Sequence, residues 1–159
     1  MCAGIYLDVI TNIQSIMIYT KNPKHFSPTI EVVGCFMEKH GEILLLCRNK
    51  SKPQGGKWGI PAGKIDYGES KEEAMKREII EETGYVGSFE KLTYKDHIFA
   101  RIDNVDLVFS IFHLPIPEPF LIKIHKHEHT TYSWIKPEEA FRLDLMEDLD
   151  ICIKQMYDM

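Results

Sequence analysis

The stretch GKIDYGESKEEAMKREIIEETGY, residues 63–85, carries the signals that decide how this chain folds. Ser70 followed by Glu73 is a capping box, which predicts the start of a helix. Gly84 stands where a left-handed C-cap belongs. The sequence therefore predicts one helix between these signals, preceded by a long glycine-rich loop, which is either a functional segment or a misassigned one.

Three glutamates on this helix have a spacing that needs an explanation. Glu78, Glu81 and Glu82 stand at i, i+3 and i+4, so they share one face. Like charges at this spacing cost an isolated helix roughly 0.2–0.5 kcal/mol per pair, and the chain already has a formal net charge of −5. One interpretation is a solvated acidic face. The other is a site for a hard divalent cation such as Mg²⁺, which prefers oxygen ligands and removes the repulsion.

Length and composition limit the classes of protein that fit. With 159 residues, of which 44% are apolar and 27% charged, the chain is expected to form one globular domain. The acidic balance gives no support for a general binder of nucleic acid or anionic membranes. The four cysteines form no C-x-x-C pair, and neither a secretory signal nor a membrane-spanning apolar run is visible. We therefore expect reduced thiols and a cytoplasmic location.

The remaining sequence predicts strands on both sides of the central helix. Residues 4–19 have the apolar spacing of an amphipathic helix, followed by a linker that ends near residue 29. Strands are expected at residues 29–38, 42–49, about 85–100, 105–114 and 120–135. Two short helices follow, the last using Leu145, Leu149, Ile153 and Met156. This order indicates an α/β fold with a mixed sheet.

The stretch that opens this section resembles the Nudix box, G-x5-E-x7-R-E-U-x-E-E-x-G-U, in which U is apolar or aromatic. All seven fixed positions match, and Ile79 and Tyr85 occupy the two U positions. KWGIPAG, residues 57–63, is similar to the W-x-x-P-G-G approach of this family, with Ala62 in place of the commoner glycine. The match in the box is specific because its fixed residues are charged or glycine at set distances.

The resemblance covers roughly residues 30–157 and implies a Nudix-type α/β/α sandwich with a central mixed sheet over residues 30–159. Residues 1–29 then form an N-terminal extension, with its helix and linker. Three roles are open for that helix: it covers a sheet edge, lines the substrate cleft or makes a contact in a homodimer.

The resemblance also implies a Mg²⁺ site, with Mn²⁺ as a substitute. The implied ligands are the carbonyl of Gly63 and the carboxylates of Glu78, Glu81 and Glu82. Glu69 and Arg77 would form a supporting ion pair that holds the loop against the helix, and a substrate contact by Arg77 is the alternative.

The family's site usually includes one more acidic group from a loop after the box. Glu128, a few residues before a Tyr-x-Trp strand, is the candidate, with an exposed loop glutamate as the alternative. Either Glu78 or Glu128 would serve as the general base. His125, His127 and His129 alternate nearby, and exposed histidines are favoured over a zinc site.

The implied reaction is metal-assisted hydrolysis of a nucleoside diphosphate linked to another group. The favoured substrate is a (d)NTP or modified nucleotide that gives NMP and pyrophosphate, with Arg48, Lys64 and Trp58 as candidate contacts. The alternatives are a nucleotide-sugar or ADP-ribose pyrophosphatase, an RNA 5′-end pyrophosphohydrolase, and a non-catalytic nucleotide-sensing module. The intact box argues against the sensing module. The net charge does not suggest a basic groove, so a small nucleotide is expected as partner rather than nucleic acid.

Overall fold

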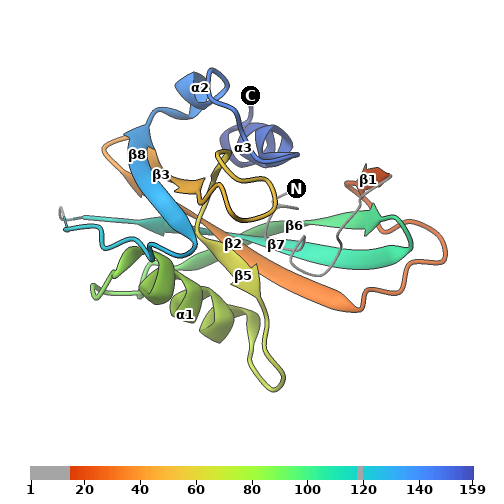
Figure 1. Ribbon diagram of the computed structural model, residues 1–159. Coiled ribbons are helices and arrows are strands. Elements are labelled where there is room, and N and C mark those ends of the chain that lie inside the picture. The colour runs from red at the N-terminus through yellow and green to blue at the C-terminus, as the bar shows by residue number, and fades with distance from the viewer. Residues whose placement is uncertain (1–14, 118–119) are drawn as a thin grey trace.

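The computed structural model describes residues 15–117 and 120–159, which form a mixed sheet covered by helices on both faces (Figure 1). The strands are β1 (Ile16–Tyr19), β2 (Ile30–Lys39), β3 (Glu42–Arg48), β4 (Trp58–Gly59), β5 (Ala62–Lys64), β6 (Thr93–Ile102), β7 (Val105–Pro115) and β8 (His129–Ile135). The helices are α1 (Lys71–Thr83), α2 (Pro137–Ala140) and α3 (Leu149–Tyr157). The predicted α/β class is therefore confirmed.

The sheet is mixed because β2 and β7 run parallel while its other strand pairs are antiparallel. Its order is β1-β6-β7-β2-β3-β4, with β5 paired to β2 and β8 paired to β3. Figure 1 shows α1 on one face and α2 and α3 on the other. None of the helices in the described ranges is long and apolar enough to cross a membrane.

Alternate residues of the central strand β2 serve two separate cores. Val32 and Phe36 belong to the cluster that includes residues of α3, here called the α3-side core. Val33, Cys35 and Met37 belong to the cluster that includes residues of α1, here called the α1-side core. Successive side chains of a strand point to opposite faces, so a strand covered on both sides reads as a continuous apolar run. This explains why "VVGCFM" lacks the polar alternation of a half-exposed strand.

Helix α1 begins and ends where its sequence signals predict. The Glu73 N–H donates to Ser70 Oγ at 3.2 Å, and the Ser70 N–H donates to the Glu73 carboxylate at 2.8 Å. Gly84 closes the helix with φ 69°, in the left-handed region that favours glycine. Met75 and Ile79 are fully buried against the sheet, and both predicted ends of α1 are confirmed.

Ile79 and its neighbour Ile80 provide a matched test of this packing. Ile79 is fully buried, whereas Ile80 is 46% exposed. We expect Ile79→Ala to lower the free energy of unfolding by about 2–5 kcal/mol, because the removed atoms leave a cavity against the sheet. Ile80→Ala should lower it by less than about 1 kcal/mol. Denaturant unfolding followed by circular dichroism measures both, and equal losses would contradict the packing.

The N-terminal helix predicted for residues 4–19 is wrong for the part that the structure describes. Residues 16–19 form strand β1, which pairs antiparallel with β6, and Ile16 lies opposite Ile102. Ile16 and Ile18, two positions apart, both pack against the α3-side core, which is the spacing of a strand face. The predicted helix up to residue 14 lies outside the described residues.

Two predicted strands also begin later than expected, because apolar loop residues extended the sequence pattern. β6 begins at Thr93 rather than near residue 85, and β8 begins at His129 rather than near residue 120. Tyr85 and Ile122 are buried in the α1-side core without belonging to a strand. Burial without strand pairing thus accounts for both errors. The last helix begins at Leu149, so Leu145 precedes it.

Candidate active site

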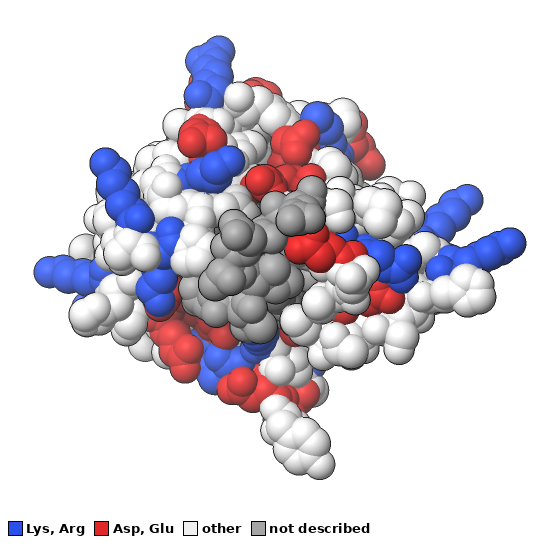
Figure 2. Space-filling model, turned by 45° about the vertical axis from the view of Figure 1, so that its right-hand side comes forward, with Lys and Arg blue, Asp and Glu red and all other residues white. Residues whose placement is uncertain are grey.

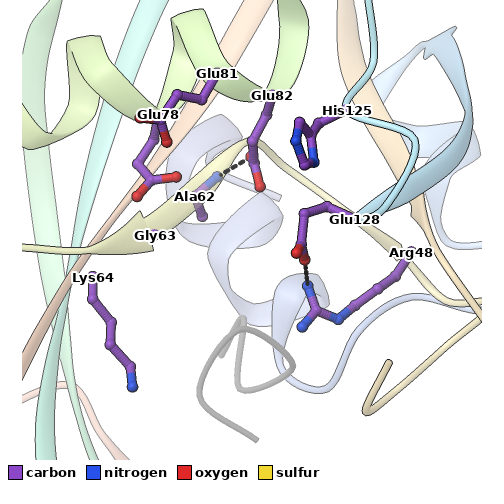
Figure 3. Close-up of a pocket in the computed structure, with 9 residues that line it drawn as sticks. All are labelled: Arg48, Ala62, Gly63, Lys64, Glu78, Glu81, Glu82, His125 and Glu128. Carbon is purple, nitrogen blue, oxygen red and sulfur yellow. Dashed lines mark hydrogen bonds and ion pairs between the residues drawn. The ribbon is translucent and has the colours of Figure 1, made fainter. Parts of the chain in front are cut away.

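A cavity of about 560 Å³ lies beside α1 (Figure 3). The helix contributes Glu78, Glu81 and Glu82, here called the helix glutamates. Figure 3 shows Arg48 and Glu128 across the cavity from them, on β3 and on the segment before β8. The fold therefore brings together residues from distant parts of the sequence, with acidic groups on both sides of one opening.

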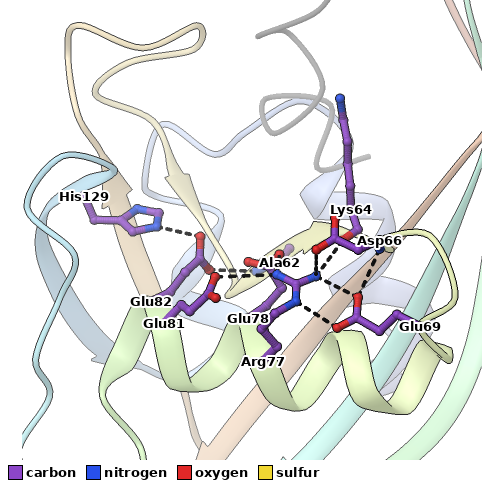
Figure 4. Close-up of polar contacts among 9 residues, drawn as sticks. All are labelled: Ala62, Lys64, Asp66, Glu69, Arg77, Glu78, Glu81, Glu82 and His129. Atoms are coloured by element: carbon purple, nitrogen blue, oxygen red, sulfur yellow. Dashed lines mark hydrogen bonds and ion pairs between the residues drawn. The ribbon is translucent and has the colours of Figure 1, made fainter.

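Glu82 is held at both oxygens of its carboxylate. Its side chain is buried, and its Oε2 accepts the backbone N–H of Ala62 at 2.9 Å. Its Oε1 lies 3.0 Å from Nε2 of His129, which is also buried (Figure 4). Both carboxylate oxygens therefore have a hydrogen-bond partner in a rigid element of the sheet.

This contact corrects the prediction for the three histidines. His125 and His127 are exposed as expected, but His129 is only 3% exposed and faces Glu82. Within residues 15–117 and 120–159, no three His, Cys, Asp or Glu side chains are grouped closely enough to hold a metal as they stand. The alternating histidines therefore do not form a ready-made zinc site.

Glu78 lies against the backbone of β5 at Gly63. A Cβ placed on Gly63 would lie 1.9 Å from Oε1 of Glu78, so only a glycine allows this approach. Burial, and then the negative charge of Glu82, raise the pKa of Glu78 to about 7, although Arg77 opposes the shift. The burial of Glu78 and its proximity to Glu82 thus both disfavour its ionised form, and Arg77 only partly offsets them.

Arg77 and Glu69 form the ion pair that the resemblance implied (Figure 4). Arg77 Nε and Nη2 donate to the two Glu69 oxygens at 2.8 and 2.9 Å. Nη2 also donates to the carbonyl of Lys64 at 2.9 Å, and Nη1 donates to Glu78 Oε1 at 2.6 Å. One guanidinium therefore ties the loop, strand β5 and a site carboxylate to the helix.

This ion pair predicts how stability responds to acid. The hydrogen bonds from Arg77 and then from the Asp66 N–H lower the pKa of Glu69 from 4.5 to about 2. A lowered carboxyl pKa contributes stability that is complete above pH 4.5 and is lost as the pH falls towards 2. We expect Glu69→Gln to reduce the slope of the unfolding free energy against pH in this window. The reduction should correspond to the uptake of about one proton. Denaturant unfolding at several pH values measures it, and an unchanged slope would contradict the prediction.

Glu128 is paired rather than a simple exposed loop residue. Its carboxylate lies 2.8 Å from Lys52 Nζ and 3.6 Å from Arg48 Nη1, and its side chain is 30% exposed. Burial acts to raise the pKa of Glu128, but the hydrogen bond and charge of Lys52, with Arg48, outweigh it and lower the pKa. Glu128 is therefore a charged group on the side of the cavity opposite α1.

The structure separates the three candidate substrate contacts. Arg48 and Lys64 line the cavity, and Arg48 is held by a hydrogen bond from Nε to the carbonyl of Pro53 at 2.9 Å. Trp58 is not among the lining residues. It packs against the α3-side core and bridges to Leu145, so a substrate contact by Trp58 finds no support in this position.

The donor set fits a hard divalent cation. Mg²⁺ takes oxygen ligands, usually one or two carboxylates with several waters, and so needs no cluster of three preformed ligands. Gly63 and the helix glutamates line the same cavity and offer only oxygen donors. Burial, and then the charge of Glu82, raise the pKa of Glu78, and a bound cation would favour the ionised carboxylate against both.

His129 is the residue that sequence reasoning missed, because its alternation with His125 and His127 favoured exposure. Its position directly after Glu128 was visible, but its contact with Glu82 joins residues 47 positions apart. No local pattern reports a contact of that length.

Comparisons with known proteins agree with this geometry. Residues 28–156 match the family model described as the NUDIX domain. The chain is 33% identical over 119 residues to the CTP pyrophosphohydrolase of Escherichia coli K12, covering 73% of this chain and 82% of that protein. It is 31% identical over 125 residues to the nucleoside triphosphatase NudI of Escherichia coli K12, covering 71% and 86%.

A solved structure supports the same relationship. The crystal structure of the MutT protein from Methanosarcina mazei Go1 superposes with a TM-score of 0.66 at 25% identity, covering 82% of this chain and 94% of that one. With the intact box, the sandwich fold and the shared sequence all in agreement, the chain belongs to the Nudix family of hydrolases.

Proposed function

We propose that this Nudix hydrolase cleaves a phosphoanhydride bond of a nucleoside triphosphate or modified nucleotide in the presence of Mg²⁺, releasing NMP and pyrophosphate. Mn²⁺ is expected to substitute. The observation that carries the proposal is that one cavity is lined by Gly63, the helix glutamates and Glu128, with Arg48 and Lys64 on its wall. The two relatives named for a pyrophosphohydrolase and a nucleoside triphosphatase support a triphosphate substrate.

The residues around the cavity divide into three roles. Gly63 and the helix glutamates would hold the cation. When bound there, it would neutralise phosphate charge and lower the pKa of a bound water. Lys64 and Arg48 are cations that line the cavity and would contact phosphate oxygens. Arg77 holds Glu78 and the loop in place through four hydrogen bonds.

Two carboxylates are candidates for accepting the proton of the attacking water. Glu78 lies against Gly63 with Arg77 as its partner, and Glu128 lies across the cavity with Lys52 as its partner. The two can be told apart by the pH dependence of kcat in Glu78→Gln and Glu128→Gln. The variant that lacks the base should lose the acidic limb of the profile, whereas the other should retain it at a lower rate.

An RNA 5′ end is the alternative substrate that the surface bears on most directly. In Figure 2, Asp and Glu side chains alternate with Lys and Arg over the coloured part of the face, without a continuous basic area. A protein that tracks a polynucleotide backbone needs such an area. We therefore favour the free nucleotide.

A product screen tests the proposal. The full chain is incubated with Mg²⁺ and a panel of NTPs, dNTPs, ADP-ribose, a nucleotide sugar and a 5′-triphosphorylated oligonucleotide, and the products are separated chromatographically. We expect NMP and pyrophosphate from at least one triphosphate, and no product when EDTA removes the metal. Cleavage of ADP-ribose or nucleotide sugar alone, or of the oligonucleotide alone, would replace the proposed substrate. Nucleotide binding without any product would indicate a sensing module.

A further inference from the structure

We propose that His129 is a positioning residue that holds the Glu82 carboxylate in the orientation in which it binds the cation. The inference rests on the proposed function of the cavity and adds a residue that lies outside the Nudix box. Its basis is the contact between His129 Nε2 and Glu82 Oε1 at 3.0 Å, between two buried side chains.

The local structure of β8 accounts for the direction of this side chain. The pairing of β3 with β8 shifts register at Cys47 and Arg48, so that Arg48 lies opposite His129 while Cys47 lies opposite Thr131. Such a bulge redirects the side chains next to it. Accordingly, His129 is buried although Thr131, two positions on, is exposed.

The turn that leads into His129 is held by hydrogen bonds, so the backbone that carries the ring is fixed in place. The His129 N–H donates to the carbonyl of His125 at 2.9 Å. The Asn49 N–H donates to the carbonyl of Glu128 at 2.8 Å, and Asn49 Nδ2 donates to the carbonyl of Lys126 at 3.1 Å. The turn that carries Glu128 into the cavity is thus the same turn that presents His129 to Glu82.

The chemistry of the contact defines which ring nitrogen carries the proton. An ionised carboxylate only accepts hydrogen bonds, so Nε2 of His129 must be the donor. Nδ1 is buried and has no hydrogen-bond partner among the described residues. A buried nitrogen without a partner costs stability. The ring is buried in spite of this cost, and its Nε2 makes the hydrogen bond to Glu82.

Glu82 is thereby set apart from Glu81. It has one donor on each oxygen, from the Ala62 N–H and from His129, and each carboxylate oxygen has two lone pairs. One lone pair per oxygen therefore remains for a cation. Glu81, in contrast, is 58% exposed at its side chain and lies 3.5 Å from Arg77. Glu82 is a preset ligand, and Glu81 must be ordered when the cation binds.

Cation affinity in the absence of nucleotide tests this role. We expect His129→Leu to weaken Mn²⁺ binding about 10–100-fold, the usual effect of losing a group that orients a metal ligand. His129→Gln should remain within about threefold of wild type, because its amide nitrogen can donate from a similar position. His127→Leu, on the same turn but exposed, is the matched control and should bind like wild type. Isothermal titration calorimetry or EPR of Mn²⁺ gives the affinities.

A second measurement keeps the inference testable if the Leu variant does not fold. In wild type, ¹⁵N NMR of the histidine rings should show His129 with the proton on Nε2. A proton on Nδ1 alone, or a folded His129→Leu with wild-type Mn²⁺ affinity, overturns the inference. Wild type that fails to bind Mn²⁺ overturns the cation site and the inference together. If Mn²⁺ affinities follow the expected order while no nucleotide is hydrolysed, the inference is upheld and only the proposed reaction falls.

Discussion

Glu82→Gln is expected to lower kcat by about 10²–10³-fold, because a carboxylate that helps to stabilise charge at a metal site lowers the activation barrier by several kcal/mol. Glu82 is buried, and each of its oxygens accepts one hydrogen bond. Glutamine keeps the length and one acceptor, which can still meet the Ala62 N–H. The glutamine side chain lacks the negative charge that attracts a cation. Mn²⁺ affinity should fall together with kcat.

The Glu82→Gln protein should still fold, which separates a loss of chemistry from a loss of structure. Its new amide group would face the Nε2–H of His129, donor to donor, but the ring can move its proton to Nδ1 and accept instead. Glu72→Gln is the matched control on the same helix. Glu72 is exposed and pairs with Lys76 at 2.7 Å, so its loss should leave kcat unchanged. Wild-type turnover in Glu82→Gln would remove the helix glutamates from the mechanism.

Gly63→Ala is expected to lower kcat by about 10²-fold or more while leaving the fold intact. The added methyl carbon would lie 1.9 Å from Oε1 and 2.0 Å from Cδ of Glu78. Those atoms are the far end of a flexible side chain, so Glu78 can rotate away. That rotation displaces a candidate ligand by an ångström or more, and a misplacement of about 1 Å in an active site can cost about 10²-fold.

Two readouts distinguish displacement of Glu78 from a general loss of structure in Gly63→Ala. Gly63 pairs with Val33 in the sheet, and alanine is compatible with a strand, so the thermal midpoint should move by only a few degrees. Mn²⁺ affinity should fall, because the carboxylate no longer occupies its position at β5. A stable Gly63→Ala variant with full activity and full Mn²⁺ affinity would show that the close approach of Glu78 has no part in the reaction.

The features predicted correctly from sequence are those whose causes lie within a few residues. The capping box joins positions three apart, the C-cap needs only the glycine at its own position, and the shared face of the helix glutamates follows from helical rotation. The strands predicted at residues 29–38 and 42–49 are of the same kind, since a local turn joins them, in which His40 and Gly41 both have positive φ. The match to the box rests on the same local spacing.

The secondary-structure prediction was wrong where apolar residues are buried without belonging to the predicted helix or strand. The segment before β8 holds Ile122, which is buried in a loop, and β1 lies at the end of a stretch, residues 4–19, whose apolar spacing fits a helix. Burial reports only that a residue contacts a core. Whether the backbone there pairs as a strand depends on a partner elsewhere in the chain, and for β1 that partner is β6.

The sequence by itself determined the family, the ends of α1 and the row of acidic side chains, because each is a matter of residue type at short spacing. Only the tertiary structure decided that Glu128 lies across from that row, that Trp58 belongs to a core, and that His129 reaches Glu82 from 47 positions away. The sheet sets these distances by placing β3, β5 and β8 around the end of α1. Contacts between such elements depend on their packing in space, which no short stretch of sequence encodes.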